Sequence, residues 1–207
     1  MKILEGHPVI PVVVLDDAAH AAGLGRALVE GGVPIAEITL RTPAALDAIA
    51  TMARNRDLLV GAGTVLTPEQ ATLAAEAGAR FAVCPGLSRP VVERCRMLGL
   101  PVLPGVATAT EVLAALESGL EAVKFFPAST SGGAPAVAAL GAVFPDVRFV
   151  PTGGITAAGA GDYLALPSVL AVGGSWMVPR AVLASGDLDQ IRSLIGGVRD
   201  VAAAAGR

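Results

Sequence analysis

Residues 102–126, which read VLPGVATATEVLAALESGLEAVKFF, contain the pattern that decides the fold of this chain. Two short apolar runs, 102–104 and 122–126, flank an alanine-rich stretch at 109–118. The apolar runs are typical of buried strands, and the alanine-rich stretch, with Thr108 as its N-cap, is typical of a helix. Strands that are joined by a helix rather than by a tight turn pair in parallel. The segment therefore predicts one β–α–β unit.

The same unit recurs along the whole chain with a repeat of roughly twenty residues. We expect strands at 9–15, 35–40, 58–61, 81–84, 102–104, 122–126, 148–151 and 169–172, and helices at 17–30, 43–54, 67–77, 89–98, 109–118, 134–143, 157–164 and 188–205. This alternation predicts an α/β fold, specifically a closed (β/α)8 TIM barrel. The alternative, an open doubly wound sheet, needs a glycine-rich fingerprint after the first strand, and 11–17 has none. No linker or low-complexity segment interrupts the pattern, so residues 1–207 are predicted to form a single domain.

Composition excludes several classes of protein. The chain is 53% hydrophobic and only 16% charged, which supplies a large core without disulfides. A net charge of −3, no basic run and 3% aromatic residues argue against a nucleic-acid partner. No apolar run has transmembrane length, so no membrane partner is expected.

His7 and His20 lack metal-ligand spacing, which predicts no metal site. Cys84 and Cys95, without a signal peptide, are expected to be reduced thiols in a cytoplasmic protein.

Lys124 is the residue that most strongly suggests chemistry. In a strand of period two it shares one face with Ala122 and Phe126, within an otherwise apolar segment. A buried ammonium is costly unless it is paired or its charge is lost, and a desolvated lysine amine is a nucleophile that forms Schiff bases with ketones. The alternative is a strand-end lysine whose amine reaches water.

Other polar residues fall at the predicted carboxyl ends of strands, where this fold places its active sites. Glu37, Thr39 and Arg41 share one face of the second strand. Glu37 is expected either to form an internal salt bridge with Lys124 or to act as a carboxylate base beside an amine nucleophile, and the two roles are compatible. Thr152-Gly153-Gly154 and Gly173-Gly174-Ser175 follow the seventh and eighth strands, the usual phosphate-binding loops of this fold. These loops predict a phosphorylated ligand.

Six motifs in order carry a resemblance to a known family. They are EITLRT (37–42), GAGTVL (61–66), CPGL (84–87), KFFPA (124–128), PTGGI (151–155) and GGSW (173–176). With them the chain resembles the bacterial 2-keto-3-deoxy-6-phosphogluconate (KDPG) aldolases, class I aldolases of the Entner–Doudoroff pathway, some of whose relatives cleave 4-hydroxy-2-oxoglutarate (KHG). The family often reads Glu-Ala-Asn after this Pro-Ala, where the present chain has Ser129-Thr130-Ser131.

The resemblance implies a homotrimeric barrel that needs no cofactor or metal. It implies Lys124 as the Schiff-base lysine, Glu37 as the general acid/base, and Arg41 and Thr64 as ligands of the pyruvate carboxylate. The same resemblance implies that the remaining substrate-binding residues are Pro85, Phe126, Thr152, Gly153, Gly154, Gly174 and Ser175, with the glycines and Ser175 holding the phosphate.

The resemblance predicts cleavage of KDPG to pyruvate and glyceraldehyde 3-phosphate, a phosphorylated keto acid being the small-molecule partner. The galactonate epimer and KHG remain alternative substrates for the same chemistry. An epimerase or decarboxylase would need a second acid/base residue or a metal set, and the sequence has neither. A non-catalytic binder of phosphorylated metabolites would have lost the lysine or the glutamate, and both are present.

Overall fold

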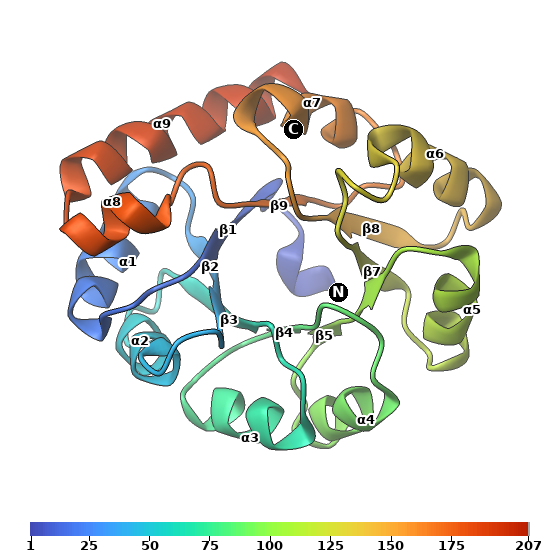
Figure 1. Cartoon of the computed structure of the whole chain (residues 1–207), viewed down its shortest axis with the longest axis horizontal. Helices are drawn as coiled ribbons and strands as arrows, with labels where there is room; N and C mark the ends of the chain where they lie inside the picture. Colours follow the sequence, from blue (N-terminus) through green and yellow to red (C-terminus); the bar gives the residue numbers. More distant parts are fainter. Residues whose placement is uncertain (207) are drawn as a thin grey trace.

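The computed structural model describes residues 1–206, so Arg207, the last residue of the predicted domain, lies outside the described residues. Figure 1 shows short strands around a central space, with the α-helices outside them. This arrangement confirms an α/β fold in which a curled parallel sheet is covered by helices.

The elements follow the predicted alternation of strand and helix. The strands are β1 (Val9–Val13), β2 (Ile35–Thr39), β3 (Leu59–Gly63), β4 (Ala82–Val83), β5 (Val102–Leu103), β6 (Gly105–Val106), β7 (Ala122–Phe125), β8 (Arg148–Pro151) and β9 (Val172–Gly174). The α-helices are α1 (Ala21–Glu30), α2 (Ala45–Met52), α3 (Pro68–Glu76), α4 (Arg89–Met97), α5 (Ala109–Glu117), α6 (Gly133–Val143), α7 (Ala157–Leu164), α8 (Arg180–Ser185) and α9 (Leu188–Ala204). Two short 3-10 helices are η1 (Lys2–Leu4) and η2 (Ala18–His20).

All strand ladders in residues 1–206 are parallel. Six strands pair in the order β5-β4-β3-β2-β1-β9, and three more in the order β6-β7-β8. Pro104 alone separates β5 from β6, because proline has no amide hydrogen to donate to a ladder. Its carbonyl still accepts a hydrogen bond from the Lys124 amide at 2.8 Å.

Two details near the C-terminus differ from the prediction. The expected strand at 169–172 is wrong in position, since the ladder with β1 runs from Val172 to Gly174 and pairs Val172 with Val9. Val169 forms an isolated bridge to Phe149. The glycines of this strand carry no side chains, so period-two patterning could not mark it. Helix α8 was also not predicted, because it has only 6 residues.

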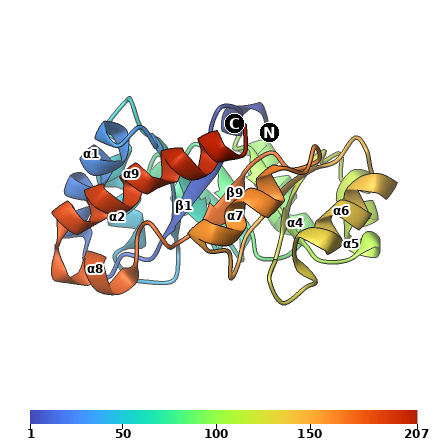
Figure 2. The ribbon, with the colours of Figure 1, turned by 90° about the horizontal axis from the view of Figure 1, so that it is seen from above.

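The interior is apolar on both faces of the strands. Every residue of β1 and of β2 is buried, which is usual for a parallel sheet covered by helices. Leu4 of η1 is fully buried, and Figure 1 shows this turn at the centre of the ring behind the strands. Figure 2 shows α9 running diagonally across β1 and β9, where it packs against α1, α7 and α8. A polar side chain inside this core therefore needs a specific reason.

Candidate active site

The buried polar side chains of residues 1–206 all line the same cavity. They are Glu37, Thr39, Lys124 and Thr152. The cavity measures about 410 Å³, within the range of small-molecule sites, and lies at the carboxyl ends of the strands. All the site residues selected from the sequence line it, namely Glu37, Arg41, Thr64, Pro85, Lys124, Phe126, Thr152, Gly153, Gly154, Gly174 and Ser175. Parallel pairing brings them together, because it places the carboxyl ends of all strands at one edge.

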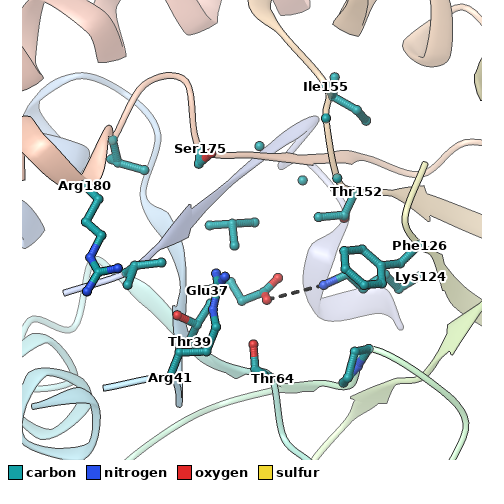
Figure 3. A pocket seen from close by; sticks show the side chains of 18 residues that line it. Glu37, Thr39, Arg41, Thr64, Lys124, Phe126, Thr152, Ile155, Ser175 and Arg180 are labelled. Carbon is teal, nitrogen blue, oxygen red and sulfur yellow. Dashed lines mark ion pairs between the residues drawn. The ribbon is translucent and has the colours of Figure 1, made fainter. Parts of the chain in front are cut away.

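Lys124 and Glu37 form the central pair (Figure 3). Lys124 Nζ lies 3.7 Å from Glu37 Oε1, and the two side chains are only 6% and 4% exposed. Nζ also lies 4.9 Å from the centroid of the Phe126 ring, a cation–π contact that the shared strand face predicts. The distance of 3.7 Å is too long for a hydrogen bond. Glu37 Oε1 accepts no hydrogen bond from any described residue. The pair therefore leaves one buried carboxylate oxygen beside the lysine amine without a hydrogen-bond donor among the described residues.

Glycine on the neighbouring strand makes room for this carboxylate. Glu37 pairs in register with Gly61, and Thr39 with Gly63. A Cβ built on Gly63 would collide with the Glu37 carboxylate. On the other side, the Thr39 hydroxyl donates to the carbonyl of Val13 at 2.9 Å, which ties β2 to β1 beside the cavity. Backbone spacing and not a hydrogen bond to the carboxylate thus sets the position of Glu37.

Arg41 and Thr64 follow the neighbouring strands β2 and β3, and Figure 3 shows Thr64 below the central pair. Thr64 has φ 57°, and it is the one described residue other than glycine with a positive φ. A β-branched residue rarely adopts this conformation, which costs roughly 1–3 kcal/mol and tends to occur at functional sites. The flanking Val65 amide is held by the carbonyl of Val83 at 3.1 Å. The sheet therefore imposes the conformation that directs Thr64 to the cavity.

The two glycine loops close the opposite side. Gly153 and Gly154 have φ of 103° and 73°, a region that strongly favours glycine. A Cβ at Gly154 would collide with Ser129, and one at Gly174 would collide with the Trp176 ring. Packing inside the protein therefore requires these glycines, in addition to any need for their amides to approach a ligand.

Sequence reasoning missed several residues that line the cavity. These are Val12, Val14, Ile155, Val178 and Arg180. Thr39 was placed on the same strand face as Glu37 and Arg41, and Gly173 in the predicted phosphate loop, but neither was selected as a site residue. Arg180 had no local signal, since its partner Asp16 is 164 positions away in the sequence.

Cys84 follows β4 and precedes Pro85 of the cavity wall. Burial raises the pKa of the Cys84 thiol to about 12, and the nearby Cys95 thiol adds to this effect while the Lys124 charge opposes it. Burial also raises the pKa of the Cys95 thiol to about 11. Both thiols are therefore protonated at neutral pH and are poor nucleophiles.

Among residues 1–206, no group of three or more His, Cys, Asp or Glu side chains is placed to hold a metal ion. Within this part of the chain, no helix combines the length and the apolar composition that crossing a membrane requires.

Comparison with known proteins agrees with the motifs. The KHG/KDPG aldolase of Escherichia coli strain K12 is 47% identical over 194 residues, which cover 93% of this chain and 91% of that protein. The structure of the KDPG aldolase of Zymomonas mobilis ZM4 with 3-phosphoglycerate is 44% identical, with a TM-score of 0.90 and coverage of 95% and 92%. The KDPG aldolase of Legionella pneumophila, with pyruvate captured as a covalent carbinolamine, is 41% identical, with a TM-score of 0.91 and coverage of 95% and 96%. Residues 1–194 match the model of the aldolases described as KDPG and KHG aldolase. The predicted resemblance is confirmed, and the chain belongs to the KDPG and KHG aldolase family.

Proposed function

We propose that this protein is a class I aldolase that cleaves KDPG to pyruvate and glyceraldehyde 3-phosphate. The observation that carries the proposal is the buried Lys124 amine, 3.7 Å from a Glu37 carboxylate oxygen that has no other partner, in the wall of the cavity. A carbon–carbon lyase of this class needs an amine nucleophile beside an acid/base group. No second amine lines the cavity among the described residues.

Lys124 acts as the nucleophile. After it has passed its proton to Glu37 or to water, Nζ attacks the C2 ketone and forms a carbinolamine, which loses water to give an iminium ion. The Legionella relative, with pyruvate held as a carbinolamine, supports the first of these steps. The ring of Phe126, 4.9 Å from Nζ, and the buried strand around Lys124 keep bulk water away from the amine.

Glu37 acts as the general acid/base. Its carboxylate accepts the proton of the C4 hydroxyl while the C3–C4 bond breaks, and the electron pair of that bond flows into the iminium to form an enamine. Glyceraldehyde 3-phosphate leaves. Glu37 then returns the proton to C3, directly or through water, and hydrolysis of the resulting iminium releases pyruvate and regenerates the Lys124 amine.

The ends of the substrate are held on opposite sides of the cavity. We assign the pyruvate carboxylate to Arg41, an exposed guanidinium, and to Thr64, whose conformation aims it inward. We assign the phosphate to the loops of Gly153, Gly154, Gly174 and Ser175. The Zymomonas structure with 3-phosphoglycerate, a phosphorylated carboxylic acid, supports a site of this kind. Pro85, Phe126 and Thr152 form the wall between the two ends.

KHG is a second candidate substrate, since the relative from Escherichia coli carries both substrates in its name. KHG has no phosphate, so its cleavage depends on Lys124, Glu37 and the two carboxylate ligands, Arg41 and Thr64. The galactonate epimer of KDPG differs at C4, the carbon whose hydroxyl faces Glu37. Measuring kcat/KM for KDPG, its C4 epimer and KHG ranks the three, and absence of cleavage of all three would contradict the proposal.

The proposal extends to the whole chain. We infer that residues 1–207 form one domain and that the two strand groups close into a single (β/α)8 barrel. Parallel bridges between Phe149 and Val169 and between Thr152 and Gly173, together with the single-residue gap at Pro104, support closure.

We also infer a cytoplasmic homotrimer. Several exposed leucines on and next to α3 and α5 support a subunit interface, namely Leu66, Leu73, Leu113 and Leu116. The two cysteines are free thiols, as expected in a reducing compartment. Sedimentation analysis tests the trimer, and a monomeric mass at micromolar concentration would contradict it.

A further inference from the structure

Arg180 is the one cavity-lining cation that the proposed mechanism leaves without a role. The cations among the described lining residues are Lys124, Arg41 and Arg180. Lys124 is assigned as the nucleophile that attacks the C2 ketone. Arg41 lies with Thr64 at the side assigned to the pyruvate carboxylate. The substrate has a second anionic end, its phosphate, and Arg180 is the lining cation that remains for it.

Arg180 belongs to the segment that carries the proposed phosphate loop. It is the first residue of α8 and follows Gly174, Ser175 and Val178, which line the same cavity. Figure 3 shows Arg180 at one edge of the cavity, with Ser175 between it and Thr152 and with Lys124 on the far side. A phosphate held by the Ser175 amide and hydroxyl would therefore lie on the Arg180 side of the cavity.

In the absence of substrate, Arg180 pairs with Asp16 in the loop after β1. Its Nε and one terminal nitrogen donate to the two oxygens of Asp16 at 2.7 and 2.6 Å. The guanidinium holds the pKa of the Asp16 carboxyl below its ordinary value, so the carboxylate is charged at neutral pH. The side chains are 63% and 42% exposed, and an exposed pair of this kind contributes little to stability. Exchange of its carboxylate partner for a phosphate therefore costs little.

We propose that Arg180 is a specificity-determining residue, whose guanidinium turns from Asp16 to the terminal phosphate of the substrate and so selects phosphorylated over unphosphorylated keto acids. The inference rests on the proposed function. A dianion attracts a guanidinium more strongly than a single carboxylate does, and arginine binds phosphate through two parallel hydrogen bonds. Asp16 holds the Arg180 side chain at the cavity edge. The negative charge of Asp16 also repels any phosphate that is not paired with the Arg180 guanidinium.

The first experiment compares Arg180→Gln with Arg192→Gln. Arg192 is a matched control, because it also forms exposed ion pairs, with Glu30 and Asp189, but it lies on α9 and does not line the cavity. We expect Arg180→Gln to lower kcat/KM for KDPG by about 10-fold, the loss expected for one charge-assisted contact at an exposed site. The value for unphosphorylated 2-keto-3-deoxygluconate and the rate of pyruvate trapping should not change. Arg192→Gln should leave all three values unchanged, and Arg180→Lys should restore part of the loss.

The second experiment removes the competing carboxylate. Asp16→Asn should lower the KM for KDPG by about 3-fold, because the phosphate no longer competes with Asp16 for the guanidinium. If Asp16→Asn instead raised KM as Arg180→Gln does, the ion pair itself would be what matters, as a structural tie, and the proposal would be overturned.

The outcomes separate this inference from the proposed function. A wild-type enzyme that traps pyruvate and prefers KDPG, with the same preference in Arg180→Gln, would overturn only the role of Arg180. A wild-type enzyme that traps no pyruvate would overturn the proposed function itself, since trapping does not involve Arg180.

Discussion

Two carboxylate–cation pairs each contribute a cation to the cavity wall, and the two pairs differ in almost every respect. Lys124 and Glu37 are buried in the strands, 3.7 Å apart, and one carboxylate oxygen accepts no hydrogen bond from the described residues. Asp16 and Arg180 lie in the exposed loops, and both of their contacts, at 2.6 and 2.7 Å, have good hydrogen-bond distances. The Asp16–Arg180 pair therefore has the better hydrogen-bond geometry, and it is also the pair whose charges are screened by water.

The difference between the two pairs indicates where the chain gives up folding stability. A buried ion pair with poor geometry is unfavourable for folding, because desolvation of the two charges exceeds their attraction. Selection for stability alone would replace it with apolar side chains. The exposed pair costs little and contributes little. Removal of a partner from the Lys124–Glu37 pair should therefore abolish or strongly slow the reaction. Removal of a partner from the Asp16–Arg180 pair should cause only a small change.

The largest effect is expected at Lys124. Lys124→Arg keeps a positive charge beside Glu37, but a guanidinium stays protonated and cannot attack a ketone, so turnover of KDPG should fall to background. Lys124→Met, which removes the charge, should also lose stability because the Glu37 carboxylate is left buried without a partner. Near-normal kcat in Lys124→Arg would show that the lysine serves only as a charge.

The next effect is expected at Glu37. Glu37→Gln keeps the shape but removes the base, and cleavage of KDPG should slow by about 10²–10⁴-fold, the usual range for general acid–base catalysis. Covalent trapping of pyruvate on Lys124 should still occur. The melting temperature and kcat should be measured on the same sample. A variant that melts earlier yet keeps its kcat would make Glu37 a structural partner only.

A smaller effect is expected from Gly63, which does not line the cavity. In Gly63→Ala the new Cβ would displace the Glu37 carboxylate, and a shift of about 1 Å can cost about 10²-fold in rate. We expect a loss of about 10- to 100-fold in kcat. Gly161→Ala in α7 is the matched control, because its Cβ would meet open space, and it should have normal activity. Equal activity in the two variants would show that the position of Glu37 is not critical.

The smallest effect concerns the exposed pair and pH. Arg180 lowers the pKa of folded Asp16 below its unfolded value of about 3.9, so the pair stabilises the protein above that pH and loses this contribution as the pH falls through the folded pKa. The melting temperature of Asp16→Asn should therefore lie slightly below that of wild type at pH 7, and the two should converge as the pH falls below the folded pKa of Asp16. A gap that widened on acidification would contradict this sign.

Much of this could be predicted from sequence, because the informative residues are exceptions to local patterns. Lys124 stands out within an apolar strand, and Glu37 and Arg41 alternate with Ile38 and Leu40. The cavity then follows from parallel topology, which gathers strand ends without any knowledge of side-chain packing. The same logic placed the glycine loops and Pro85 on one rim.

Other features depend on contacts that no local pattern encodes. Arg180 reaches the cavity beside Asp16, from the opposite end of the chain, on a helix too short to show a periodicity. The ladder of β9 includes Gly173 and Gly174, which have no side chains to reveal an alternation. Gly63 matters through the space that it leaves for Glu37, which only coordinates reveal.

The most direct test is covalent capture of pyruvate. Lys2 and Lys124 are the only lysines in the chain, which makes the position of an adduct easy to assign. Lys2 is exposed near the N-terminus and serves as an internal control for non-specific reaction. After incubation with pyruvate and borohydride, peptide mass spectrometry should find one reduced pyruvate per chain, on Lys124 and not on Lys2. An active enzyme with no adduct, or with the adduct on Lys2 or the N-terminal amine, would contradict the assignment of Lys124 as the Schiff-base residue.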